Sequence, residues 1–261
     1  MKEFTRIASA VLVYTAICIA QTPVTPRKFE VASVKPSDPD VRGTNVRYPS
    51  GTFTATGITA KNCIALAYNL QPFQLEGGPR WIADQRYDVI AKLPAGTVKG
   101  PQDPERVPRM RAALQALLAD RFRLAIHRET KVVPGYALMV AKGGFKLKEA
   151  EDDGRGVDIS SNRGKLVAER ISMGTLARNL SGNLGSPVVD KTDIKGIFNL
   201  TLAWAPDEMQ SPGKPGTEAA EPSTGPSIFS ALQEQLGLKL ETQKATVEMV
   251  VIDRIEKPTA N

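Results

Sequence analysis

Histidine and cysteine are scarce in this chain of 261 residues, which has one histidine, His127, and two cysteines, Cys18 and Cys63. A metal centre with two histidines is therefore excluded, and so is any serine–histidine–aspartate triad that does not use His127. His127 falls on the polar side of an alternating segment, beside Arg123. We interpret it as a surface residue, with a role as general base as the alternative.

The common motifs of nucleotide-binding proteins and hydrolases are also missing. The sequence contains no G-x-G-x-x-G, no G-x-x-x-x-G-K and no G-x-S-x-G. One S-x-x-K match, Ser211 to Lys214, contains Pro212 and Gly213, which oppose the helical turn that this motif requires. The acidic residues of segment 149–158 do not have EF-hand spacing, so they indicate a solvated linker rather than a calcium site. We therefore predict no cofactor and no metal.

A long apolar run occurs only at the N-terminus. Two basic residues, Lys2 and Arg6, precede the apolar segment 7–19, and small residues follow at the positions required for cleavage before Gln21. The run is shorter than the ~20 apolar residues that cross a bilayer comfortably. We predict a signal peptide over residues 1–20 and an exported protein, periplasmic or extracellular, with an uncleaved anchor as the alternative.

Positive charge is in excess but is not concentrated. The formal net charge is +6, and no basic cluster resembles a nucleic-acid footprint, so no nucleic-acid partner is predicted.

The chain is long enough to build an apolar core without disulfides. Once a leader is removed, Cys63 is the remaining cysteine, and its place near the apolar face of a predicted helix indicates a buried, inert thiol. A nucleophile and an intermolecular disulfide are the alternatives.

The sequence does contain an internal similarity. Residues 164–180 align with residues 51–67 without a gap. A second plan, a helix followed by two strands with a turn between them, occurs in residues 113–142 and again in residues 231–253. We predict an α+β fold built by tandem duplication of helix-plus-β-hairpin units, with antiparallel sheets covered by helices on one face.

Local signals place the elements within this plan. Thr59 and Ser172 are expected to cap helices at their N-termini, as is Ser227. Gly237 is placed to end a helix in a left-handed conformation. The Val-Pro-Gly sequence at Val133–Gly135 predicts the turn of the first hairpin.

The predicted organisation has five parts in chain order. A signal peptide (1–20) is followed by an N-terminal strand and loop (21–50) and a first α+β half (51–148). An acidic linker (149–163) then leads to a second α+β half (164–258), which contains a flexible loop at 207–226.

One loop has the residue types of a recognition site. Gly77 and Gly78 provide a flexible backbone, Arg80 can form two parallel hydrogen bonds, and Trp81 offers a large aromatic surface. We predict these four residues as a ligand-binding site. The alternative is a turn whose tryptophan packs into the core.

Carboxylates offer a further enzymatic hypothesis. A hydrolase or other enzyme would use residues such as Asp84, Asp88 or Asp190, and a pair of carboxylates about 5 to 10 Å apart in a cleft would support it.

Five long segments carry a resemblance to a known family. They are FEVASVKPS, GGPRWIADQRYDVIAKLP, LLADRFRLAIHRETKVVPGYALMVAKGGFKLK, GSPVVDKTDIKGIFNLTLAWAPDE and LQEQLGLKLETQKATVEMVVIDRIEKP. Across nearly the whole mature chain, the sequence resembles a large family of exported soil-bacterial proteins, expanded in acidobacterial genomes, whose domain has no known function. The resemblance implies no reaction. Some members of that family are joined to membrane metallopeptidase modules of the antibiotic-sensor type, which implies a sensing or ligand-presenting role.

A weaker similarity is one of element order. The succession of strands, helices and hairpins is similar to the short N-terminal domain of secretins and TonB-dependent transducers, which implies partner binding rather than catalysis. From the residues and these resemblances together, we expect an exported, non-enzymatic protein that binds a peptide, another protein or a cell-envelope ligand. An extracytoplasmic hydrolase and a signalling ectodomain are the alternatives.

Overall fold

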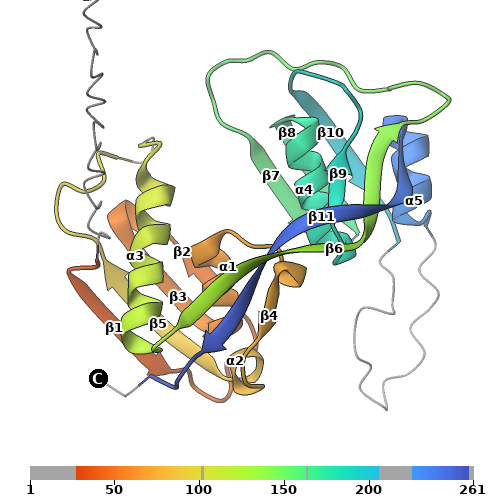
Figure 1. Ribbon diagram of the computed structural model, residues 1–261. Helices are drawn as coiled ribbons and strands as arrows, with labels where there is room; N and C mark the ends of the chain where they lie inside the picture. Colours follow the sequence, from red (N-terminus) through yellow and green to blue (C-terminus); the bar gives the residue numbers. More distant parts are fainter. Residues whose placement is uncertain (1–27, 101–102, 163, 206–224, 259–261) are drawn as a thin grey trace, which may run out of the picture.

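The computed structural model describes residues 28–100, 103–162, 164–205 and 225–258, and Figure 1 shows them arranged as two lobes joined by a pair of long strands. The predicted signal peptide, the Ser211–Lys214 match and most of the predicted flexible loop lie outside the described residues. The chain has both helices and several antiparallel sheets, so the predicted α+β class is confirmed.

The N lobe is an antiparallel sheet with helices packed on one of its faces. Its strands, in spatial order, are β1 (Val31–Pro36), β5 (Arg86–Lys92), β3 (Thr52–Thr59) and β2 (Asn45–Arg47). Its helices are α1 (Ala60–Tyr68), α2 (Trp81–Asp84) and α3 (Arg106–Arg121), with short 3-10 turns η1 (Pro49–Gly51) and η2 (Pro72–Gln74). Side chains of β5 alternate between buried and outward positions, and Ile90 on the outward face is 57% exposed. One face of this sheet is therefore open in the described part of the chain.

The C lobe also consists of an antiparallel sheet and helices, and it is smaller than the N lobe. Its antiparallel sheet has the order β10 (Phe198–Ala203), β8 (Lys165–Ile171) and β7 (Asp158–Asn162). The helical elements are α4 (Met173–Leu184), α5 (Ile228–Ala231) and the π-helical turn η4 (Leu232–Leu236).

The predicted helix boundaries are confirmed by their capping contacts. The Thr59 hydroxyl accepts a hydrogen bond from the Asn62 backbone N–H at 3.2 Å, and Ser172 accepts one from Thr175 at 3.2 Å. Ser227 caps α5 in the same way. Gly237 follows η4 with φ +68°, the left-handed conformation expected at this position.

Two long strands connect the lobes. β6 (Ala125–Val140, green in Figure 1) pairs antiparallel with β11 (Leu238–Arg254, blue) along almost their whole lengths. At the N-lobe end, β4 (Leu75–Gly77) adds to β11 in parallel; at the C-lobe end, β9 (Val188–Asp190) adds to β6 in parallel.

The predicted hairpins are wrong. Neither the turn at Val133–Gly135 nor the turn within residues 231–253 exists, because each segment is one extended strand paired with the other. Gly135 is needed for a close approach instead: a Cβ there would be 2.5 Å from the Pro187 backbone oxygen. The Tyr136 N–H donates to that same oxygen at 2.8 Å.

As a result, the two halves of the chain share both cores. Val250 and Ile252, from the end of the chain, are buried in the N-lobe core. Leu138, from the first half, is buried in the C-lobe core. The order strand, helix, short parallel strand occurs in both β3–α1–β4 and β8–α4–β9, but the tandem duplication itself stays a prediction.

Candidate functional site

The N lobe contains a cavity of about 490 Å³ between β2, α1 and α3. Apolar side chains make up most of its lining. Five lining residues carry polar groups, and one of these is a tyrosine. The lining residues are Thr44, Val46, Tyr48, Ile58, Asn62, Ala65, Leu66, Asn69, Leu70, Val107, Met110, Arg111 and Leu114. Ligand sites for small molecules have this size and this mixture of apolar walls and a few polar groups.

A bulge at Gly57 positions the β2 wall of this cavity. The pairing of β3 with β5 shifts register between Ala55 and Ile58, and Gly57 has φ +68°. A Cβ on Gly57 would be 2.2 Å from the Gly43 backbone oxygen, so only glycine allows the segment before β2 to approach β3. The Thr44 hydroxyl then donates to the Gly57 carbonyl at 2.9 Å, which holds the start of this segment in place.

Helices α1 and α3 form the opposite wall because their apolar faces pack together. Met110 and Leu114 on α3 are buried, each with 1% exposure, and they meet the α1 side of the cavity. The Gln115 side-chain N–H donates to the Ala67 carbonyl at 2.8 Å and ties the two helices together. The floor of the cavity is therefore a fixed part of the N-lobe core.

A hydrogen bond joins two of the polar residues that line the cavity. Asn69 ends α1 in a left-handed conformation with φ +56°, and its side-chain oxygen accepts a hydrogen bond from Arg111 Nη2 at 2.7 Å. Of the lining residues that the structure describes, Arg111 is the single formally charged one. Its positive charge also opposes the rise in the pKa of Tyr48 that burial causes.

Apolar surface is exposed where the cavity opens. Tyr48 is 37% exposed and Val107 is 44% exposed, and both belong to the lining. Such side chains lose contact with water when a ligand covers them, which favours binding of apolar groups.

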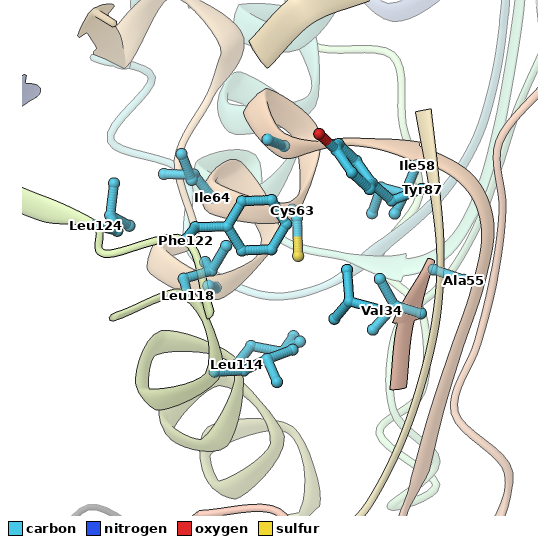
Figure 2. Close-up of a cluster of buried hydrophobic side chains, with 14 of the residues drawn as sticks. Val34, Ala55, Ile58, Cys63, Ile64, Tyr87, Leu114, Leu118, Phe122 and Leu124 are labelled. Atoms are coloured by element: carbon cyan, nitrogen blue, oxygen red, sulfur yellow. The ribbon is translucent and has the colours of Figure 1, made fainter. Parts of the chain in front are cut away.

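Cys63 lies beneath this site rather than in it. It is buried among the N-lobe core residues, and Figure 2 shows its sulfur within the cluster that contains Leu114 and Phe122. Burial raises the pKa of its thiol to about 12. The thiol therefore stays protonated at neutral pH, as a buried cysteine without a nearby base should.

The predicted binding loop has structural contacts for most of its residues. Gly77 has φ +77°, and a Cβ there would be 3.0 Å from the Ile252 backbone oxygen; at Gly78 a Cβ would be 2.8 Å from Ile82 Cδ1. Both glycines thus allow β4 and its turn to approach neighbouring elements closely.

The two side chains of this loop point to different environments. Trp81 packs partly buried against the N-lobe core, and the Lys257 Nζ lies 6.0 Å from its ring centroid. Arg80 is exposed and pairs with Asp84 at 3.4 Å. None of the four loop residues lines the cavity, and ligand binding by the loop stays a prediction.

Two of the three candidate carboxylates, Asp88 and Asp190, accept hydrogen bonds that support the nearby backbone. Asp88 Oδ1 accepts hydrogen bonds from the Ser37 hydroxyl at 2.6 Å and from the Gly57 N–H at 2.9 Å. Asp190 Oδ1 accepts from the Thr192 N–H at 2.9 Å. Asp88 therefore holds the bulge that shapes the cavity, and Asp190 holds the turn after β9.

His127 is exposed and hydrogen-bonded, with 2.7 Å between its Nδ1 and Asp253 Oδ1. The two residues lie near the N-lobe end of the β6–β11 pair.

In the described ranges, no group of three or more His, Cys, Asp or Glu side chains is close enough to hold a metal ion. No helix within those ranges is long and apolar enough to span a membrane.

A second cavity, of about 430 Å³, lies between the lobes. Its lining includes Gln71 from the N lobe and Arg178 and Asn179 from α4, and Ile159 is the only apolar side chain among its described residues. Without an apolar wall, this space offers less binding energy than the N-lobe cavity.

The N-lobe cavity could not be predicted from the sequence, because the segment that forms one of its walls has little hydrophobic periodicity. Residues 37–49 are dense in proline, aspartate and glycine, which indicates a loop, yet they contain β2. The alternation of Val46 and Tyr48 with charged or polar neighbours was the available signal. The α1 and α3 residues of the cavity look like ordinary core residues in sequence.

No curated protein and no solved structure is significantly similar to this chain. The similarity in element order to secretin and TonB-dependent domains stays a prediction. A family model described as "Protein of unknown function (DUF3738)" matches residues 61–255, which include α1 apart from Ala60, α3 and the described elements of the C lobe. The chain belongs to this DUF3738 family of proteins of unknown function.

Proposed function

We propose that this protein is an exported, non-enzymatic binding protein, and that an apolar ligand of small-molecule size occupies the N-lobe cavity. The observation that carries the proposal is the cavity itself: it has a volume of about 490 Å³, mostly apolar walls, and apolar side chains exposed at its mouth. Burial of apolar ligand surface there would stabilise a complex by about 25 cal/mol per Å² before the costs of association.

The alternative of a carboxylate hydrolase has less support. Asp88 and Asp190 each accept hydrogen bonds from their own neighbourhood, and neither lines the N-lobe cavity. Asp84 is exposed and pairs with Arg80. The arrangement of these carboxylates is that of structural acceptors rather than of an acid and base facing one substrate.

Filling the cavity tests the proposal. Ala65 lines the cavity from α1, and Ala65→Phe would place an aromatic ring in the space for the ligand. The probe is the neutral dye Nile red, whose fluorescence rises in apolar surroundings. We expect the wild-type protein to bind the dye with a 1:1 stoichiometry and Ala65→Phe to lose at least tenfold in affinity.

Ala83→Phe is the matched control, because Ala83 is an exposed helical residue outside the cavity. It should leave dye binding within twofold of the wild type. Equal loss in both variants, or no saturable binding by the folded wild type, would count against the cavity as the site. Thermal unfolding of each variant shows that the comparison is made between folded proteins.

Export rests on the N-terminal pattern and has its own test. Mass spectrometry of the protein recovered from the periplasm or medium should show a mature chain that begins at Gln21. An intact N-terminus in the membrane fraction would instead support the uncleaved anchor.

A further inference from the structure

We infer that the ligand of the N-lobe cavity is an amphipathic carboxylate, with its acid group at Arg111 and its apolar part between α1, α3 and β2. This inference rests on the proposed function and adds the chemical class of the ligand. It assigns Arg111 as the residue that determines specificity.

The charge of the cavity is the first observation. Among the described residues that line it, Arg111 is the single formally charged one, and none is acidic. In the described part of the chain, no carboxylate forms an ion pair with Arg111. A ligand with one negative charge would therefore meet an uncompensated positive charge, whereas a cationic ligand would meet repulsion.

The hydrogen bonding of Arg111 is the second observation. A guanidinium has five N–H donors, and Arg111 Nη2 uses one of them at 2.7 Å from Asn69 Oδ1. That bond fixes the orientation of the planar group without neutralising its charge. The remaining donors match the two oxygens of a carboxylate, which arginine binds through parallel hydrogen bonds.

The placement of the apolar walls is the third observation. Leu66 lies on α1 and Leu70 follows just after its end, and Val107 and Met110 precede Arg111 along α3, so apolar side chains from both segments line the cavity together with Arg111. A chain bound with its carboxylate at Arg111 would bury its hydrocarbon part against these residues. Tyr48 adds an aromatic face and a hydroxyl, whose pKa is raised by burial, so it stays a neutral donor at physiological pH.

Isothermal titration with three matched probes tests this inference. Decanoate, 1-decanol and decyltrimethylammonium share a ten-carbon chain and differ in the charge of the head group. We expect the wild type to bind decanoate at least tenfold more tightly than decanol, and decyltrimethylammonium most weakly.

Arg111→Gln should remove this preference by weakening decanoate binding about tenfold or more while leaving decanol within twofold. Arg80→Gln is the control, because it removes the same charge from an exposed residue outside the cavity. It should leave all three affinities unchanged. Arg111→Lys should keep part of the preference, since the charge is kept but the fork geometry is lost.

The outcomes separate the two proposals. Equal binding of decanoate and decanol, unaffected by Arg111→Gln but lost in Ala65→Phe, would overturn the carboxylate inference and leave the apolar cavity site standing. An equal loss of decanoate affinity in Arg80→Gln would also overturn it, because the effect would then be one of net charge. If the folded wild type binds none of the probes, both proposals fail.

Discussion

Gly57 is the residue on which the shape of the candidate site depends most. It combines a positive φ of 68° with a Cβ position 2.2 Å from the Gly43 oxygen, and its N–H and C=O are held by Asp88 and Thr44. At the scale of residues, the shape of the site therefore depends on backbone contacts at Gly57, which a single added methyl group disrupts.

We predict that Gly57→Ala lowers the free energy of unfolding by about 2 kcal/mol or more, because alanine would be strained in this conformation and would clash. Gly43→Ala is the matched control: it alters the other partner of the contact, but its Cβ would meet no atom within 4 Å, so the change should be within about 0.5 kcal/mol. Urea unfolding of both variants measures the difference. Similar stabilities for the two would show that the bulge tolerates a side chain.

Cys63 gives a prediction about pH. Burial raises the pKa of its thiol from 9.0 to about 12, so between these values the unfolded chain loses a proton that the folded protein keeps. The contribution of Cys63 to stability is thus complete below pH 9 and decreases as the pH rises toward 12. We expect the stability of the wild type to fall more steeply from pH 8.5 to 10.5 than that of Cys63→Ala, measured by urea unfolding with both proteins at each pH. Parallel curves would mean that the thiolate is tolerated in the folded core.

At the scale of elements, the sequence predicts helices better than strand partners. Thr59, Ser172 and Gly237 act within one turn of the chain, and their capping roles could be predicted because local chemistry decides them. The partner of a strand is decided by distant residues. The Val-Pro-Gly sequence of β6 has the composition of a turn, but its glycine is required by the approach of Pro187.

A cross-link tests the long strand pair directly. Val132 and Thr246 are both exposed and lie opposite each other in the register of β6 and β11. We predict that the double variant Val132→Cys, Thr246→Cys forms an intramolecular disulfide under mild oxidation, detected by mass spectrometry of the linked peptides. The pair Val132→Cys, Glu241→Cys is the control, since Glu241 faces Ala137 further along the ribbon. Cross-linking of the control pair alone would contradict this register.

At the scale of the whole molecule, β6 and β11 make the two lobes interdependent. Val250 and Leu138 each belong to the core of the lobe built mainly by the other half of the chain. The lobes also touch directly, because Arg178 Nη2 donates to the Asn69 carbonyl at 2.8 Å. Asn69 thereby joins the rim of the cavity to the C lobe, a contact that no local pattern in the sequence could have revealed.

We therefore predict that the protein unfolds in one cooperative transition. The chain contains two tryptophans, and Trp81 packs on the N-lobe core while Trp204 packs on the C-lobe core. Trp204→Phe leaves a reporter of the N lobe, and Trp81→Phe leaves a reporter of the C lobe. For each variant, the urea midpoint measured by tryptophan fluorescence should equal the midpoint measured by far-ultraviolet circular dichroism. Distinct midpoints for fluorescence and circular dichroism would show that the lobes unfold separately.

A crystal structure of the protein with decanoate tests the central claim most directly. We predict one decanoate in the N-lobe cavity, with both carboxylate oxygens at hydrogen-bonding distance from the Arg111 guanidinium and the chain against Leu66 and Met110. A decanoate bound only in the cavity between the lobes, or seated in the N-lobe cavity with its carboxylate turned away from Arg111, would contradict it.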